Sequence, residues 1–123
     1  LMLTEPVSRA RTRLFLQIFE RDLMPFVRML EARRASDEQK ALARRRILAC
    51  LQVLSMRIGP TKFIFGDEFQ MIDAVLAPIL WRLPHYGIDL PPETERLMTY
   101  AERLFSRQSF IDSMTAQERS MRR

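Results

Sequence analysis

The chain has 123 residues, of which 47% are hydrophobic, and its 20 basic and 15 acidic side chains give a net charge of +5. This length suits a single domain with a sizeable core. Three glycines, together with long runs rich in Ala, Leu, Arg and Glu, favour helices over a sheet. Asp73 and Arg82 interrupt the best apolar run, so no membrane span is expected. The single cysteine, Cys50, leaves no partner for an internal disulfide and is compatible with a reducing cytoplasm, where we expect the protein.

The positive charge is concentrated in the first part of the chain. Residues up to Ile58 include 12 basic and 6 acidic side chains (+6), whereas the later residues include 8 and 9 (−1). Eighteen of the 20 basic residues are arginines, which pair well with carboxylates and phosphates. Acidic protein surfaces and nucleic acids are therefore both possible partners.

The first predicted helical segment extends from about Val7 to Arg33. Pro6 suits its first turn, whereas Pro25 must kink or split it. Apolar residues at helical spacing define the face that we expect to be buried: Leu14, Ile18, Phe19, Phe26 and Leu30.

The second predicted segment extends from Ser36 to Ile58 and begins with a capping box, Ser36-Asp-Glu-Gln39. Gly59-Pro60 ends it. Because consecutive helical residues are about 100° apart, Arg44, Arg45 and Arg46 cannot share one face, and we expect them on a solvated surface. The apolar stripe of this segment consists of Ala43, Ile47, Cys50, Leu51, Leu54 and Ile58.

A central helix is predicted from Met71 to Leu83, where almost every residue is apolar. A helix that is apolar on all sides is normally buried by others. With Gln70 as the N-cap, Asp73 is the third helical residue, and its carboxylate can reach free backbone N–H groups. We interpret Asp73 as a structural cap rather than a catalytic acid. Pro78 deprives the carbonyl of Ala74 of its partner and should bend the helix, at a cost of about 3 kcal/mol.

Three further signals follow the Pro91-Pro92 turn. Apolar spacing marks one more helix through Leu97, Met98, Ala101, Leu104 and Phe105. Ser109-x-x-Asp112 and Thr115-x-x-Glu118 are helix-start signals. The pattern as a whole predicts an all-α bundle of five to six helices.

No arrangement of residues predicts a catalytic centre, a cofactor site or a metal site. His85 is the only histidine, so a second imidazole ligand for a metal is missing. No nearby Cys or Ser is arranged with it as a nucleophile triad. Cys50 lies on the apolar stripe of its segment, and we interpret it as buried filler rather than a reactive thiol.

One stretch carries a resemblance to a known family. It reads Asp73-Ala-Val-Leu-Ala-Pro-Ile-Leu-Trp-Arg-Leu-Pro84, followed by Gly87-Ile88. This stretch resembles the C-terminal helical domain of the glutathione transferase fold, and within that fold the stringent starvation protein A family. Residues 6–22 and 109–122 extend the resemblance over essentially the whole chain. It implies a non-catalytic transcription regulator that associates with bacterial RNA polymerase holoenzyme during starvation or stationary-phase stress.

The resemblance also implies features of the intact protein. Members of the family begin with a thioredoxin-like domain, which this chain lacks. Because the chain opens at Leu1 rather than at a start methionine, we expect residues 1–123 to be the helical domain of a longer protein. Domains of this fold often pair through their first two helices, so the resemblance implies a homodimer for the full-length protein. Five residues are candidates for contact with a partner: Arg9, Arg13, Arg82, His85 and Tyr86.

Two alternatives stay open. The chain could be the helical domain of a glutathione S-transferase that supplies the hydrophobic substrate side of the active site. Phe63, Phe65 and Phe69 would then border that pocket instead of lining the core. A nucleic-acid binder ranks last, because no recognised DNA-binding motif and no aromatic-basic interleaving accompany the arginines.

Overall fold

The computed structural model describes residues 6–58, 62–64, 66 and 68–121, without the side chains of residues 6–9, 11 and 12. These described residues form seven α-helices and one 3-10 turn, with an isolated bridge between Phe63 and Gly66 as their sole β-type pairing. The predicted all-α class is confirmed. The chain divides into two compact units, Leu1–Val53 and Leu54–Arg123, which we describe separately.

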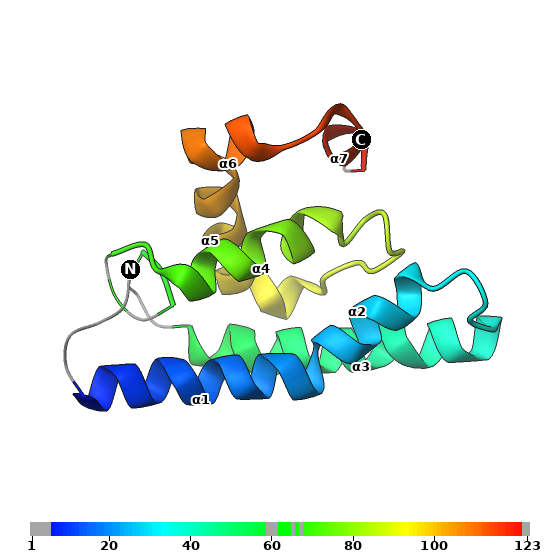
Figure 1. Ribbon diagram of the computed structural model, residues 1–123, viewed down its shortest axis with the longest axis horizontal. Helices are drawn as coiled ribbons and strands as arrows, with labels where there is room; N and C mark the ends of the chain where they lie inside the picture. Colours follow the sequence, from blue (N-terminus) through cyan, green and yellow to red (C-terminus); the bar gives the residue numbers. More distant parts are fainter. Residues whose placement is uncertain (1–5, 59–61, 65, 67, 122–123) are drawn as a thin grey trace. The chain divides into compact units, whose positions relative to one another are not determined.

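The first unit contains α1 (Pro6–Asp22), α2 (Met24–Glu31) and most of α3 (Asp37–Arg57). The predicted break near Pro25 is confirmed, because the chain changes direction between α1 and α2 (Figure 1). Pro25 is the second residue of α2. Proline is tolerated there because its missing N–H would have no intrahelical partner in the first turn.

The buried face of α1 and α2 differs from the prediction at Leu14, which is exposed, and at Leu23 and Val27, which are buried without having been predicted. Phe19, Leu23 and Val27 are at most 4% exposed. Leu14 was expected on this face, but 58% of it is exposed. Leu14 precedes Phe19 by five residues and so lies about 140° from it around the helix, which turns its side chain away from the buried face.

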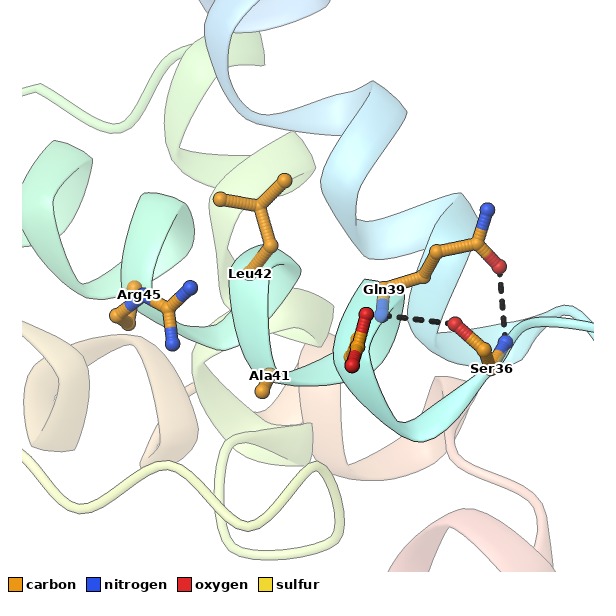
Figure 2. A pocket seen from close by; sticks show the side chains of 6 residues that line it. Ser36, Gln39, Ala41, Leu42 and Arg45 are labelled. Carbon is orange, nitrogen blue, oxygen red and sulfur yellow. Dashed lines mark hydrogen bonds between the residues drawn. The ribbon is translucent and has the colours of Figure 1, made fainter.

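The start of α3 is capped as predicted. The Ser36 hydroxyl accepts from the Gln39 N–H at 3.1 Å, and the Gln39 side chain accepts from the Ser36 N–H at 2.8 Å (Figure 2). The reciprocal bonds satisfy two donors of the helix start. Most of the predicted stripe is buried, whereas Cys50 is half-buried.

The second unit contains α4 (Met71–Arg82), a 3-10 turn (Pro92–Thr94), α5 (Glu95–Phe105), α6 (Gln108–Ser113) and α7 (Ala116–Ser120). Helix α4 packs against α5 (Figure 1). The central position predicted for α4 agrees with its six buried residues: Ile72, Asp73, Leu76, Ala77, Ile79 and Leu80.

One of the two predicted C-terminal start signals is confirmed. Thr115 caps α7, since its hydroxyl accepts from the Glu118 N–H at 3.1 Å. The prediction for Ser109 is wrong, because α6 begins at Gln108 and extended Arg107 is its N-cap residue. An N-cap must be extended so that its side chain can reach the first turn, and Ser109 already lies inside the helix.

Candidate functional site

The carboxylate of Asp73 joins three segments of the second unit. It is fully buried. One oxygen accepts from the Gln70 N–H at 2.8 Å, which caps α4. The other accepts from the Tyr100 hydroxyl on α5 at 2.6 Å and, at 3.4 Å, from the Ile64 N–H in the preceding loop. Asp73 is therefore an internal crosslink as well as a cap.

The Tyr100 hydroxyl stays protonated and so remains a hydrogen-bond donor to Asp73. Burial, followed by the adjacent Asp73 carboxylate, raises the pKa of Tyr100 far above the ordinary tyrosine value. The protonated hydroxyl satisfies a buried charge that would otherwise be costly. The side-chain oxygen of Gln70 is also buried, and it faces the Asp73 amide without a well-formed hydrogen bond among the described residues. This arrangement accounts for Asp73 by structure alone.

Trp81 and Arg82 attach the C-terminal helix α7 to the end of α4. The Trp81 indole N–H donates to the Glu118 carbonyl at 2.6 Å. The Arg82 guanidinium donates to the Glu118 carboxylate at 2.8 Å, and each of these two side chains is less than one third exposed. The bond to Arg82 lowers the pKa of Glu118. Arg82, a candidate for partner contact, is thus already paired within the chain.

Aromatic side chains surround this attachment. The Trp81 ring meets Phe105 and Phe110 edge-on, with centroid distances of 5.0 and 5.7 Å. Phe63 and Phe69 form another edge-on pair at 5.6 Å, and the Arg107 guanidinium lies 3.6 Å from the Phe69 ring centroid. Such contacts between rings, or between a cation and a ring, are typical of structural packing. Phe65, which the sequence grouped with Phe63 and Phe69, lies outside the described residues.

The turn after α4 separates the next two candidates. His85 is exposed, whereas only 7% of Tyr86 is exposed. The turn closes at Gly87, whose φ of 75° favours glycine. His85 is therefore available to a partner, and Tyr86 mainly supports the turn.

Arg9 and Arg13 both lie on α1. Arg13 is exposed. The side chain of Arg9 lies outside the described atoms, although its backbone is one helical turn from Arg13. The backbone thus places the two arginines on one face of α1, as the sequence predicts.

A wide depression lies beside the first turns of α3 (Figure 2). Its lining includes Ser36, Gln39, Leu42 and Arg45. The hydrogen-bonding groups of Ser36 and Gln39 are already paired with each other. The depression offers a ligand no buried polar group, and we assign it no binding role.

Chemically reactive groups are sparse in the described part of the chain. Burial, followed by the charge of Asp22, raises the pKa of the Cys50 thiol, which disfavours the nucleophilic thiolate. No group of three or more His, Cys, Asp or Glu residues within the described ranges could hold a metal ion. Likewise, none of the described helices has the length and apolar character to cross a membrane.

Sequence reasoning missed two hydrogen-bond partners in the second unit, Tyr100 for Asp73 and Glu118 for Arg82. Tyr100 looks like an ordinary core residue of an amphipathic helix, so nothing local points to Asp73. Glu118 was recognised as part of the α7 cap but not as the partner of Arg82. The one available signal is the charge of Arg82 in an apolar helix, which requires water or a carboxylate nearby.

The described helices and their buried acid-capped central helix define an all-α domain of the glutathione transferase type. Residues 10–103 match the family described as glutathione S-transferase, C-terminal domain. The chain therefore belongs to this family.

Individual relatives are more specific. The chain is 32% identical over 118 residues to the stringent starvation protein A homolog of Coxiella burnetii, covering 95% of this chain and 56% of that protein. It is 30% identical over 115 residues to the protein of the same name from Haemophilus influenzae, covering 93% and 53%. A third homolog, from Histophilus somni, is 28% identical over the same length and with the same coverage. The chain thus spans a little over half the length of the relatives that it matches.

Proposed function

We propose that the chain is the helical domain of a non-catalytic regulator that associates with bacterial RNA polymerase holoenzyme under starvation stress. The observation that carries this proposal is the similarity to proteins named stringent starvation protein A homolog over 93–95% of the chain. Those relatives are almost twice as long, which supports a second, thioredoxin-like domain in the intact cytoplasmic protein.

The side chains of the described residues support a role without catalysis. Asp73 is occupied by three donors, and the Cys50 thiol is disfavoured as a thiolate. A catalytic site needs an activated nucleophile, or a base and a substrate cavity brought together. The transferase alternative makes a distinct prediction. The intact protein would then bind immobilised glutathione and conjugate it to an electrophile, whereas a regulator does neither.

The partner surface should include Arg13 and His85, which are exposed, rather than Arg82 and Tyr86, which have structural partners or are buried. The basic first part of the chain would speed encounter with acidic surfaces of the polymerase. Such an effect is screened beyond about 8 Å at physiological salt. Direct binding of nucleic acid is not part of this proposal.

The test uses the full-length protein with Arg9→Glu and Arg13→Glu together. Polymerase recovered by co-purification should fall, most clearly at low salt, while helix content stays unchanged. A matched control is Arg33→Glu with Arg34→Glu, which makes the same charge change at exposed positions outside α1. Equal loss in both variants would indicate net charge rather than a specific contact. Unchanged polymerase recovery combined with lost binding to random duplex DNA would overturn the proposal.

We also propose that α1 and α3 carry a homodimer contact. Four large apolar side chains on these helices are 42–77% exposed: Leu14, Leu42, Val53 and Met56. On α3, Leu42, Val53 and Met56 recur at spacings that place them on one face. Leu42→Lys with Val53→Lys should yield a monomer by sedimentation, whereas Met71→Lys, on exposed α4 surface, should not. A double variant that sediments as the wild type would exclude this face.

A further inference from the structure

A groove in the second unit has an apolar floor. It lies between the C-terminal end of α4, the following 83–90 segment and α5, and has a volume of about 280 Å³. The floor consists of residues that are at most 4% exposed: Leu80, Leu83, Ile88 and Ala101. Leu90 and Met98 form half-buried walls. Sites for whole small ligands usually start near 300 Å³, so this α4–α5 groove suits one or two apolar side chains.

Two carboxylates stand at the edge of the α4–α5 groove. Asp89 and Glu102 both line it, and both are exposed. Among the described residues, neither carboxylate accepts a hydrogen bond or forms an ion pair. The residues after Ile58 carry nearly balanced charge, with 8 basic and 9 acidic side chains, so two carboxylates without a cation at one edge are a local excess of negative charge.

The acidic and basic side chains of α5 lie on different sides of the helix, and the acidic side faces the groove. Glu95, Met98 and Glu102 are three and four residues apart and share the groove-facing side of the helix. The arginines of α5 lie on another side. Arg96 donates to the Ile58 carbonyl at 3.4 Å, and Arg103 donates to the Lys62 carbonyl at 3.3 Å. Neither guanidinium therefore neutralises the edge of the groove.

We propose that the α4–α5 groove binds a basic segment of a protein partner, whose apolar side chain fills the floor while cationic side chains meet Asp89 and Glu102. The apolar anchor supplies burial in a preformed pocket. The cations supply orientation and selectivity, because opposite charges at an interface favour one partner and repel acidic competitors. This proposal does not depend on the regulatory role proposed above.

The probe is a capped peptide with two leucines flanked on both sides by arginines. Binding is followed by NMR of the intact protein labelled at its methionine methyl groups. The Met98 signal should shift, whereas Met56, which is 77% exposed on α3, serves as the internal reference and should not. A peptide with glutamates in place of the arginines, and one with serines in place of the leucines, should both fail to shift Met98.

The matched variants test the carboxylates. Asp89→Asn with Glu102→Gln keeps the shape of both side chains and should weaken peptide binding about fivefold at low salt. The effect is small because each solvent-exposed ion pair contributes only modestly to the binding free energy. Glu38→Gln with Glu68→Gln makes the same charge change at exposed positions outside the groove and should leave binding unchanged. Leu90→Gln, at the other half-buried wall, should weaken binding while preserving the charges and the Met98 reporter signal.

Several results would overturn the proposal. Equal binding of the glutamate peptide would indicate an apolar site without charge selection. If the Asp89→Asn, Glu102→Gln protein bound the peptide with wild-type affinity, the two carboxylates would not contribute to binding. A concentration-dependent shift of Met98 without peptide would assign the groove to a second copy of the chain. Absence of any Met98 shift with the arginine–leucine peptide would show that the α4–α5 groove does not bind a basic segment with an apolar anchor.

Discussion

The hydrogen bond between Tyr100 and Asp73 should contribute measurably to stability, and Tyr100→Phe tests it with little change in shape. The substitution removes the donor that lies 2.6 Å from the carboxylate. Hydrogen bonds to charged groups contribute about 1.5–3 kcal/mol. Asp73 keeps the Gln70 N–H and the longer Ile64 contact, so we expect a loss of about 2 kcal/mol in the free energy of unfolding.

Asp73→Ala should cost more than the loss of a helix cap. A cap alone is worth about 1 kcal/mol. Here the truncation also leaves the buried Tyr100 hydroxyl without its partner, and a stranded buried polar group costs about 1–3 kcal/mol. We therefore expect a total of about 2–4 kcal/mol. In the Tyr100→Phe background there is no hydroxyl to strand, so the same change should cost about 2 kcal/mol less.

Urea unfolding followed by circular dichroism measures both variants and their combination, provided that the denaturant slopes agree. Asp112→Ala is the control, because Asp112 is exposed and its carboxylate accepts, within the described part of the chain, from Gln108 on its own helix. It should change stability by less than about 0.5 kcal/mol. An unchanged midpoint for Tyr100→Phe, or additive effects of the two substitutions, would show that Asp73 acts as a cap alone.

Three further predictions follow from the shifted pKa values. Glu118→Gln should release α7 and red-shift the fluorescence of Trp81, the only tryptophan, without changing the helix content, whereas the control Glu38→Gln should leave the fluorescence unchanged. Because the pKa of Glu118 is lowered, acid should have the same effect on the wild type as the pH falls from the ordinary glutamate pKa of about 4.3 through the lower folded value. Because the pKa of Tyr100 is raised, stability should fall as the pH rises above about 10, and Tyr100→Phe should flatten that fall in alkaline urea titrations. Iodoacetamide should alkylate Cys50 more slowly at neutral pH than a free cysteine peptide, and an equal rate would contradict its raised pKa.

The sequence by itself determined the features that depend on a few neighbouring residues. The all-α class, the break at Pro25, and the caps at Ser36 and Thr115 each follow from local chemistry. Proline geometry and side-chain capping act within about four residues, so a linear pattern contains the needed information. The same reasoning failed at Ser109, where the motif was present but the helix began two residues earlier, with Arg107 rather than Ser109 as its N-cap residue.

Only the tertiary structure decided which distant groups meet. Asp73 could be recognised as a cap, but its bond to Tyr100 spans 27 residues. Arg82 needed either water or a carboxylate nearby, and the carboxylate that it meets, Glu118, is 36 residues away. Packing of α5 and α7 on α4 selects these partners from several chemically equivalent carboxylates and hydroxyls. Helical spacing assigns the acidic and basic side chains of α5 to different sides, but it does not identify the distant carbonyls, those of Ile58 and Lys62, that accept from Arg96 and Arg103.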